Sequence, residues 1–143
     1  MPLGPTAVGV AYFTGIKLAG YSAAGVAINR AAGPPDPNPL AFGAARTIVG
    51  VVAGVGYALV LNSVISTAPF ADFANGFPIL FYVGLIPIRA LEWLLLLWLF
   101  YRSVPAVTQK RTRYVALGVA WSYLMDLPAL FAAFSLPGGF WVC

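Results

Sequence analysis

The sequence has no histidine, a single cysteine and few charged residues. Of its 143 residues, 8% are charged and 61% are hydrophobic, whereas soluble domains carry about 25% charged residues. Histidine-ligated haem, thiolate zinc sites, iron–sulfur clusters and dithiol redox chemistry all lack their ligands. A magnesium or calcium site built from carboxylates alone remains chemically open, but no motif favours one. We therefore expect no metal and no cofactor.

Long apolar segments are abundant instead. A water-soluble domain of this size leaves about 30% of its unfolded surface exposed, which is too much for so apolar a chain. A transmembrane helix needs about 20 apolar residues, and four segments reach that length: 6–29, 47–66, 77–101 and 114–136. The sequence therefore predicts an all-α polytopic integral membrane protein, a single domain built as a four-transmembrane-helix bundle. Because no basic stretch precedes the first apolar run, we expect that run to span the membrane rather than to be a cleaved signal.

The connections between these segments differ in charge. The first, from Arg30 to Arg46, contains four prolines, which we take to exclude a helix and to favour an extended loop. With their flanks, the first connection and the third, from Arg102 to Arg113, hold six basic residues, and the second connection and both tails hold none. Basic connections mark the cytoplasmic side, so we expect an inner or plasma membrane protein with both termini outside. The basic residues form no patch with stacking aromatics, and we expect no nucleic-acid partner.

Small residues favour close packing of the first two helices. Gly43, Thr47, Gly50 and Gly54 recur at spacings of four, three and four, which makes a narrow face along the second helix. The third helix instead carries the bulky run WLLLLWLF, which suits contact with lipid. We therefore predict that the first two helices pack inside and that the cytoplasmic half of the third faces outward. Besides the bilayer, the expected partners are further copies of the chain or other membrane subunits.

Four ionisable residues lie well inside the predicted helices: Lys17, Arg89, Glu92 and Asp126. Each lies ten or thirteen residues from the arginine at the cytoplasmic end of its helix, a depth of roughly 15 to 20 Å at 1.5 Å per residue. One unpaired charge at that depth costs about 2.5 to 3.5 kcal/mol, so the two cations and two carboxylates must meet. We predict that Arg89 pairs with Glu92 on one helix face and that Lys17 pairs with Asp126 between the first and last helices.

Polar neighbours extend this predicted centre. Four side chains lie at helical spacing from the charges: Thr14, Tyr21, Tyr82 and Ser122. Pro87 and Pro128 each remove a backbone hydrogen bond beside a buried charge. Membrane helices tolerate such prolines where neighbouring groups satisfy the freed carbonyl.

The buried charges leave several interpretations open. They are a static salt-bridge lock that fixes helix register, a centre that binds a solute or moves protons or ions, or charges that pair with another subunit or reach the membrane surface. We expect a small transporter, channel or ligand-binding protein for a small solute or ion. The alternatives are an accessory subunit of a larger membrane complex and a membrane-embedded enzyme acting on a lipid or isoprenoid. No catalytic motif supports the enzyme, and the sequence does not specify a substrate.

Overall fold

A computed structural model describes residues 7–34, 36–65 and 77–128 of the chain. Over these residues the fold is all-α, as predicted, with no strand. Its helices are α1 (Ala7–Ala32), α2 (Pro39–Ile65), α3 (Phe77–Tyr101), the short α4 (Pro105–Gln109) and α5 (Arg111–Leu124). The predicted helix from 114 to 136 therefore lies partly outside the described residues.

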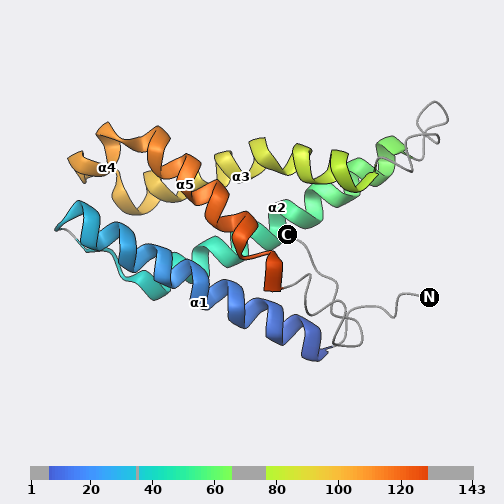
Figure 1. Ribbon diagram of the computed structural model, residues 1–143, viewed down its shortest axis with the longest axis horizontal. Helices are drawn as coiled ribbons and strands as arrows, with labels where there is room; N and C mark the ends of the chain where they lie inside the picture. The colour runs from blue at the N-terminus through green and yellow to red at the C-terminus, as the bar shows by residue number, and fades with distance from the viewer. Residues whose placement is uncertain (1–6, 35, 66–76, 129–143) are drawn as a thin grey trace.

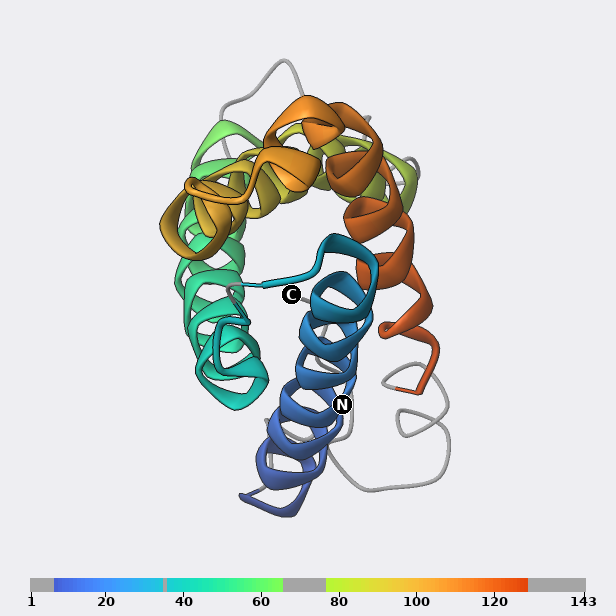
Figure 2. The same ribbon diagram turned by 90° about the vertical axis from the view of Figure 1, so that its left-hand side faces the viewer.

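The longer helices α1, α2, α3 and α5 surround a shared interior (Figure 2). Helix α1 packs along α2, and α3 packs against both α2 and α5. Seen along the long axis, α2, α3 and α5 form an arch, and α1 lies across its open side (Figure 2). The C-terminal end of α1 lies at the same end of the molecule as α4, while α2 and α3 extend together at the other end (Figure 1).

Helix α2 begins well before the predicted start. The Asn38 side-chain oxygen accepts hydrogen bonds from the backbone N–H groups of Leu40 and Ala41 at 2.9 and 3.3 Å and so caps the helix. Pro39 follows as the first helical residue, where a missing N–H costs nothing. The predicted loop from Arg30 to Arg46 is therefore wrong at both ends, because α1 continues to Ala32 and α2 starts at Pro39.

The two internal prolines act differently. Helix α3 has the predicted bounds and continues through Pro87. Helix α5 ends at Leu124, since Pro128 has no N–H to offer the Leu124 carbonyl. The chain then turns, and the Asp126 N–H bonds to the Tyr123 carbonyl at 3.1 Å. Asp126 thus lies in a turn after α5, which corrects the expectation of an uninterrupted helix around it.

The glycines of α2 make room for two different neighbours. A Cβ atom at Gly43 would collide with Ser22 and the backbone of α1, so the two helices pack closely there. A Cβ atom at Gly50 would instead meet the side chain of Arg46. Gly54 is also buried. The face therefore serves helix contact at Gly43 and houses a charged side chain at Gly50.

The bulky run of α3 has two faces. Trp93, Leu96 and Leu97 are buried in the core, whereas the outward face is formed by Leu94, Leu95, Trp98 and Leu99. The expectation that this half of α3 faces outward holds for the second set only. A helix at the centre of an arch has neighbours on one side, so a run of apolar residues divides between core and exterior.

Two helical segments of the described chain are long and apolar enough to cross a membrane. They are Pro39–Tyr57, with a mean hydropathy of 1.5, and Val83–Tyr101, with a mean hydropathy of 1.8. The first includes Arg46 and the second includes Arg89 and Glu92. These two apolar segments therefore carry charged side chains, and those side chains are buried.

Candidate functional site

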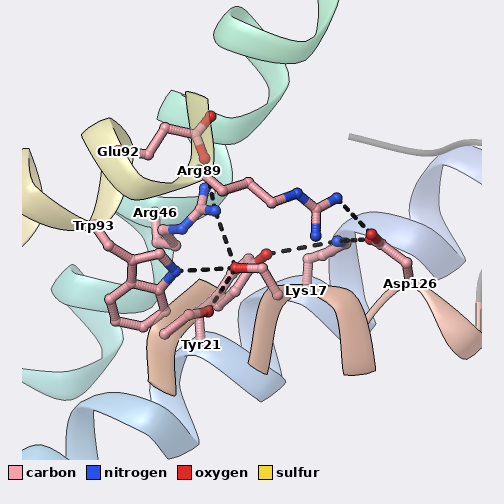
Figure 3. Close-up of polar contacts among 9 residues, drawn as sticks. Lys17, Tyr21, Arg46, Arg89, Glu92, Trp93 and Asp126 are labelled. Carbon is pink, nitrogen blue, oxygen red and sulfur yellow. Dashed lines mark hydrogen bonds and ion pairs between the residues drawn. The ribbon is translucent and has the colours of Figure 1, made fainter. Parts of the chain in front are cut away.

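Five charged side chains meet in the interior of the helix arrangement. Each is at most 7% exposed, and they come from α1, α2, α3 and the turn that follows α5 (Figure 3). Their positions are Lys17 on α1, Arg46 on α2, Arg89 and Glu92 on α3, and Asp126 after α5. We call this group the charged centre. Burial of a charge is tolerated only where the ion has partners. The pairing within the charged centre therefore shows which charges are neutralised by neighbours and which donors remain unused.

Asp126 is shared by two cations. Its Oδ1 atom accepts from the ammonium group of Lys17, and its Oδ2 atom accepts from Nη2 of Arg89. The predicted contact between Lys17 and Asp126 is therefore present in the structure. The turn that follows α5 supplies the carboxylate, so α1 and α3 are connected through a residue that belongs to neither helix.

Glu92 pairs with Arg46 rather than with Arg89. Nη2 of Arg46 lies 2.7 Å from Oε2 of Glu92. The predicted pair within α3 is therefore wrong, because Arg46 approaches Glu92 from α2 while Arg89 turns to Asp126. Sequence analysis missed Arg46 because the prolines before it were taken to place it in a surface loop. The overlooked signal was the Asn-Pro pair at residues 38 and 39, in which Asn38 caps a helix that starts at Pro39, seven positions before Arg46.

Ser122 connects α5 to the charged centre. Its hydroxyl oxygen accepts hydrogen bonds from Nη2 of Arg46 at 3.2 Å and from the indole N–H of Trp93 at 3.0 Å. It donates its own proton to the Gly118 carbonyl at 3.0 Å. One donor and two acceptor positions are all that a hydroxyl offers, so Ser122 is fully satisfied. The absence of a side chain at Gly118 leaves the space that the Trp93 ring occupies.

The other predicted site residues fall in different places. Tyr21 is buried, and its hydroxyl accepts from the Lys17 ammonium group at 3.5 Å. Its ring lies 4.7 Å from the guanidinium carbon of Arg46. Thr14 is exposed and does not join the centre, because the buried face of α1 follows a spacing of four residues through Lys17 and Tyr21. Tyr82 belongs to α3, but its side chain lies outside the described residues.

The charges of the centre do not balance. Three cations face two carboxylates, so one positive charge is left over among the described residues. The predicted set of two cations and two carboxylates was incomplete, because Arg46 adds a third cation. Two arginines also retain unused donors: Nε and Nη1 of Arg89 and Nε of Arg46 are buried without a hydrogen-bond partner. A buried donor without a partner costs about 1 to 3 kcal/mol, so the centre has a capacity for acceptors that the described side chains do not fill.

Two hollows lie near the centre and differ in chemistry. The larger, about 350 Å³, lies between α1 and α5 and has no charged residue among its described lining residues, which include four alanines of α1 and the aromatic side chains of Trp93, Tyr114 and Trp121. The smaller, about 10 Å³, lies between α1 and α2 beside Lys17 and Arg46. Among the described residues no three acidic, histidine or cysteine side chains come together as metal ligands. Of these two hollows, only the smaller has charged side chains in its described lining.

Comparison with known proteins gives no match. This holds for protein-family models, for curated proteins and for solved structures. No relative therefore assigns a role to the charged centre, and its function has to be argued from its geometry.

Proposed function

We propose that the chain is an integral membrane protein that binds and carries a small solute or ion at its charged centre. The observation that carries the proposal is that five charges are buried together with a surplus of positive charge and unused guanidinium donors. Ionisable residues at membrane depth usually mark ion pathways or ligand sites. Asp126 and Glu92 are the groups suited to exchanging protons or holding cations, and the three basic side chains are the groups suited to an anion.

The distribution of side chains supports a membrane setting. Large apolar residues on α2 and α3 are more than 60% exposed: Ile48, Val52, Leu59, Val60 and Leu91. Charged side chains from the same helices point inward. This arrangement reverses that of a soluble domain, in which charged residues are almost never fully buried, and it suits a solvent of lipid.

The proposed topology has four crossings, by α1, α2, α3 and the segment that begins with α5. Helix α1 has 26 residues, roughly 39 Å at 1.5 Å per residue, which exceeds the hydrocarbon thickness. Exposed basic residues gather at the end of the molecule where α1 ends and α4 lies: Arg30, Arg102, Lys110 and Arg113. We assign this end to the cytoplasm, which places both termini on the outer side.

The imbalance of the centre favours ligand handling over a static lock. A buried ion pair that only fixes helix register needs matched charges and filled hydrogen bonds, since desolvation otherwise exceeds the electrostatic gain. Arg46 and Glu92 form such a matched pair of one cation and one carboxylate. Lys17, Arg89 and Asp126 do not, because two cations share one carboxylate and Arg89 has donors to spare.

The test removes one cation of the charged centre and leaves the ion pairs of the two arginines intact. Lys17→Met keeps the length of the side chain and leaves Arg89 with Asp126 and Arg46 with Glu92. We expect the purified protein in proteoliposomes to move at least one of a panel of small inorganic ions and carboxylates faster than empty vesicles do. Lys17→Met should lower that flux about tenfold or more, since a hydrogen bond to a charged group contributes about 1.5 to 3 kcal/mol.

The chain offers a matched control for this variant. Lys110 is its other lysine, and it is exposed between α4 and α5, so Lys110→Met should keep the wild-type flux. Equal flux in Lys17→Met and the wild type, with both proteins folded by circular dichroism, would refute the proposal. A wild-type protein that moves nothing and elutes with a second membrane protein at fixed stoichiometry would favour an accessory subunit instead.

A further inference from the structure

The larger hollow, between α1 and α5, has no part in the proposed function. Its volume is about 350 Å³, which lies in the range of ligand sites in proteins. Its two walls are stripes at helical spacing, formed by Ala23, Ala27 and Ala31 on α1 and by Tyr114, Leu117 and Trp121 on α5. The three alanines and Leu117 are exposed, so the hollow opens outward between the two helices.

The side chains of α1 explain why the hollow exists. At its deep end the indole N–H of Trp121 donates to the Gly20 carbonyl at 3.0 Å. Met125 packs against Gly20 so closely that a Cβ atom there would collide with it. Toward the end of α1 the wall consists mainly of alanine methyl groups, which leave space in front of α5. The two helices are therefore joined near the middle of α1 and leave a gap beside its last turns.

The surroundings of the hollow suit an apolar occupant. Its lining includes the buried ring of Trp93. The indole N–H of Trp93 already donates to Ser122 at 3.0 Å, and that of Trp121 donates to Gly20. A buried water molecule needs about two to four polar partners, and these two rings offer it none. In a bilayer, contact with hydrocarbon fills such a space better, since every unfilled surface loses dispersion contacts.

The length of the hollow matches one acyl chain. From Ala23 to Ala31 the helix rises roughly 12 Å at 1.5 Å per residue. The hydrocarbon of one leaflet is half of about 30 Å thick, and an acyl chain crosses that distance. A chain in the hollow would therefore run beside the last turns of α1, from the membrane surface down to Trp121.

Basic side chains flank the hollow at its surface end. Arg30 lies three residues after Ala27 on α1, and it is exposed. Arg113 lies four residues before Leu117 on α5, and it is also exposed. Residues at these spacings share a helix face. This end carries four exposed basic residues, whereas Asp36 is the one exposed acid that the described residues bring to it (Figure 1). Basic sites of this kind between membrane helices bind anionic lipid headgroups.

We propose that the hollow between α1 and α5 binds one acyl chain of an anionic phospholipid, whose phosphate group lies between Arg30 and Arg113. The inference goes beyond the proposed function, and it rests on the membrane setting of that function but not on the charged centre. The charge at the mouth selects an anionic lipid over a zwitterionic one, because basic residues at the membrane surface attract net negative charge.

The first measurement compares two lipids with the same acyl chains. The full chain in detergent micelles is titrated with dioleoyl phosphatidylglycerol or dioleoyl phosphatidylcholine, and bound lipids are counted by native mass spectrometry. We expect one phosphatidylglycerol per chain to bind saturably, with an affinity about tenfold or more above that of phosphatidylcholine.

Ala27→Leu tests the hollow itself. Its larger side chain occupies the space between the helices, so the affinity for phosphatidylglycerol should fall about tenfold or more as methylene groups are displaced. Ala116→Leu is the matched control, since Ala116 is an exposed alanine of α5 that does not line the hollow, and its affinity should equal that of the wild type. Ala23→Leu fills the deeper end of the hollow and replaces Ala27→Leu if that variant unfolds.

The double variant Arg30→Gln, Arg113→Gln tests the headgroup. We expect the affinity for phosphatidylglycerol to fall about fivefold for each arginine and that for phosphatidylcholine to stay unchanged. Arg102→Gln is the control. Arg102 is exposed at the same end, but its guanidinium lies over the Trp98 ring of α3 at 5.6 Å, so this variant should bind both lipids as the wild type does.

The outcomes separate this inference from the proposed function. Equal affinities for the two lipids, or an affinity that neither the leucine nor the arginine variants lower, overturns the lipid site. A dimer that Ala27→Leu dissociates, with lipid binding unchanged, also overturns it and shows that a second copy fills the hollow. Saturable phosphatidylglycerol binding that is weakened in Ala27→Leu and in the double arginine variant supports the site, even where the reconstituted protein shows no flux.

Discussion

The same helices bury polar groups in two different ways, at the charged centre and at the end of the bundle near the loop between α1 and α2. At that end one buried network joins neutral groups only, namely Tyr101, Asn29 and the Pro37 carbonyl. The Tyr101 hydroxyl, with its residue 0% exposed, donates to Oδ1 of Asn29 at 2.6 Å. The Asn29 amide in turn donates to the Pro37 carbonyl at 2.8 Å. The ring of Phe42 packs against Tyr101 at a centroid distance of 5.8 Å.

The two regions differ in how completely their charges and hydrogen bonds are satisfied. The neutral network is short and complete, and it ties α3 to α1 and to the loop, as a stabilising contact should. The charged centre is larger and incomplete, with a surplus cation and buried donors that have no partner. A protein under selection for stability alone has no reason to retain that arrangement, because apolar residues in place of buried ion pairs are often as stable or more so. Trp93 marks the boundary, with its ring against Phe42 and its N–H on Ser122.

The largest expected effect comes from breaking the shared carboxylate. Asp126→Asn removes the carboxylate charge that Lys17 and Arg89 share in the buried centre. We expect the free energy of unfolding to fall by about 3 to 5 kcal/mol, the usual cost of removing one member of a buried pair. A denaturant titration in detergent micelles, followed by tryptophan fluorescence, measures the change.

The control for this variant is an acid outside the centre. Asp36→Asn alters an exposed residue of the loop between α1 and α2, and its effect should stay within about 0.5 kcal/mol. If Asp126→Asn proves no more destabilising than Asp36→Asn, the shared ion pair does not hold α1, α3 and the turn after α5 together.

Sequence reasoning predicted the all-α fold and the convergence of most of the charges for a simple physical reason. An unpaired charge within an apolar helix is energetically costly. Opposite charges at equal depth on different helices are therefore expected to pair, as Lys17 and Asp126 do. The bounds of α3 were also predicted, because its apolar run is long and ends at clear polar boundaries. These inferences depend on composition and spacing along one helix, which a sequence displays directly.

The partner of Glu92 was not predictable in the same way. Two arginines lie within reach of it, and the choice depends on the rotation of α2 about its axis, which spacing along α3 does not specify. The position of Arg46 also depends on where α2 starts, and prolines were interpreted as a loop although one of them occupies the first turn of the helix. Thr14 was assigned to the centre on a spacing of three residues from Lys17, but the buried face of α1 follows a spacing of four. Successive residues of an α-helix differ by about 100° around its axis, so this change of one position exposes Thr14.

A smaller effect is expected at the boundary between the two regions. Gly118→Ala places a methyl group where it collides with the Trp93 ring, so Trp93 must move and its bond to Ser122 must lengthen. We expect a loss of about 1 to 3 kcal/mol, typical of overpacking, measured by the same denaturant titration. Gly15→Ala is the control, since nothing lies near a Cβ atom there. It should stabilise α1 by up to about 1 kcal/mol, and a similar gain at Gly118 would contradict the tight contact.

The smallest expected effect lies in the neutral network. Tyr101→Phe removes the hydroxyl that donates to Asn29 and leaves the ring packed on Phe42, so the free energy of unfolding should fall by about 1 kcal/mol. The flux of the reconstituted protein should not change, because no charge of the centre is touched. A loss of flux in Tyr101→Phe at this modest cost in stability would show that both buried polar regions serve the same process. The proposal that the neutral network only stabilises the fold, while the charged centre handles the solute, would then be wrong.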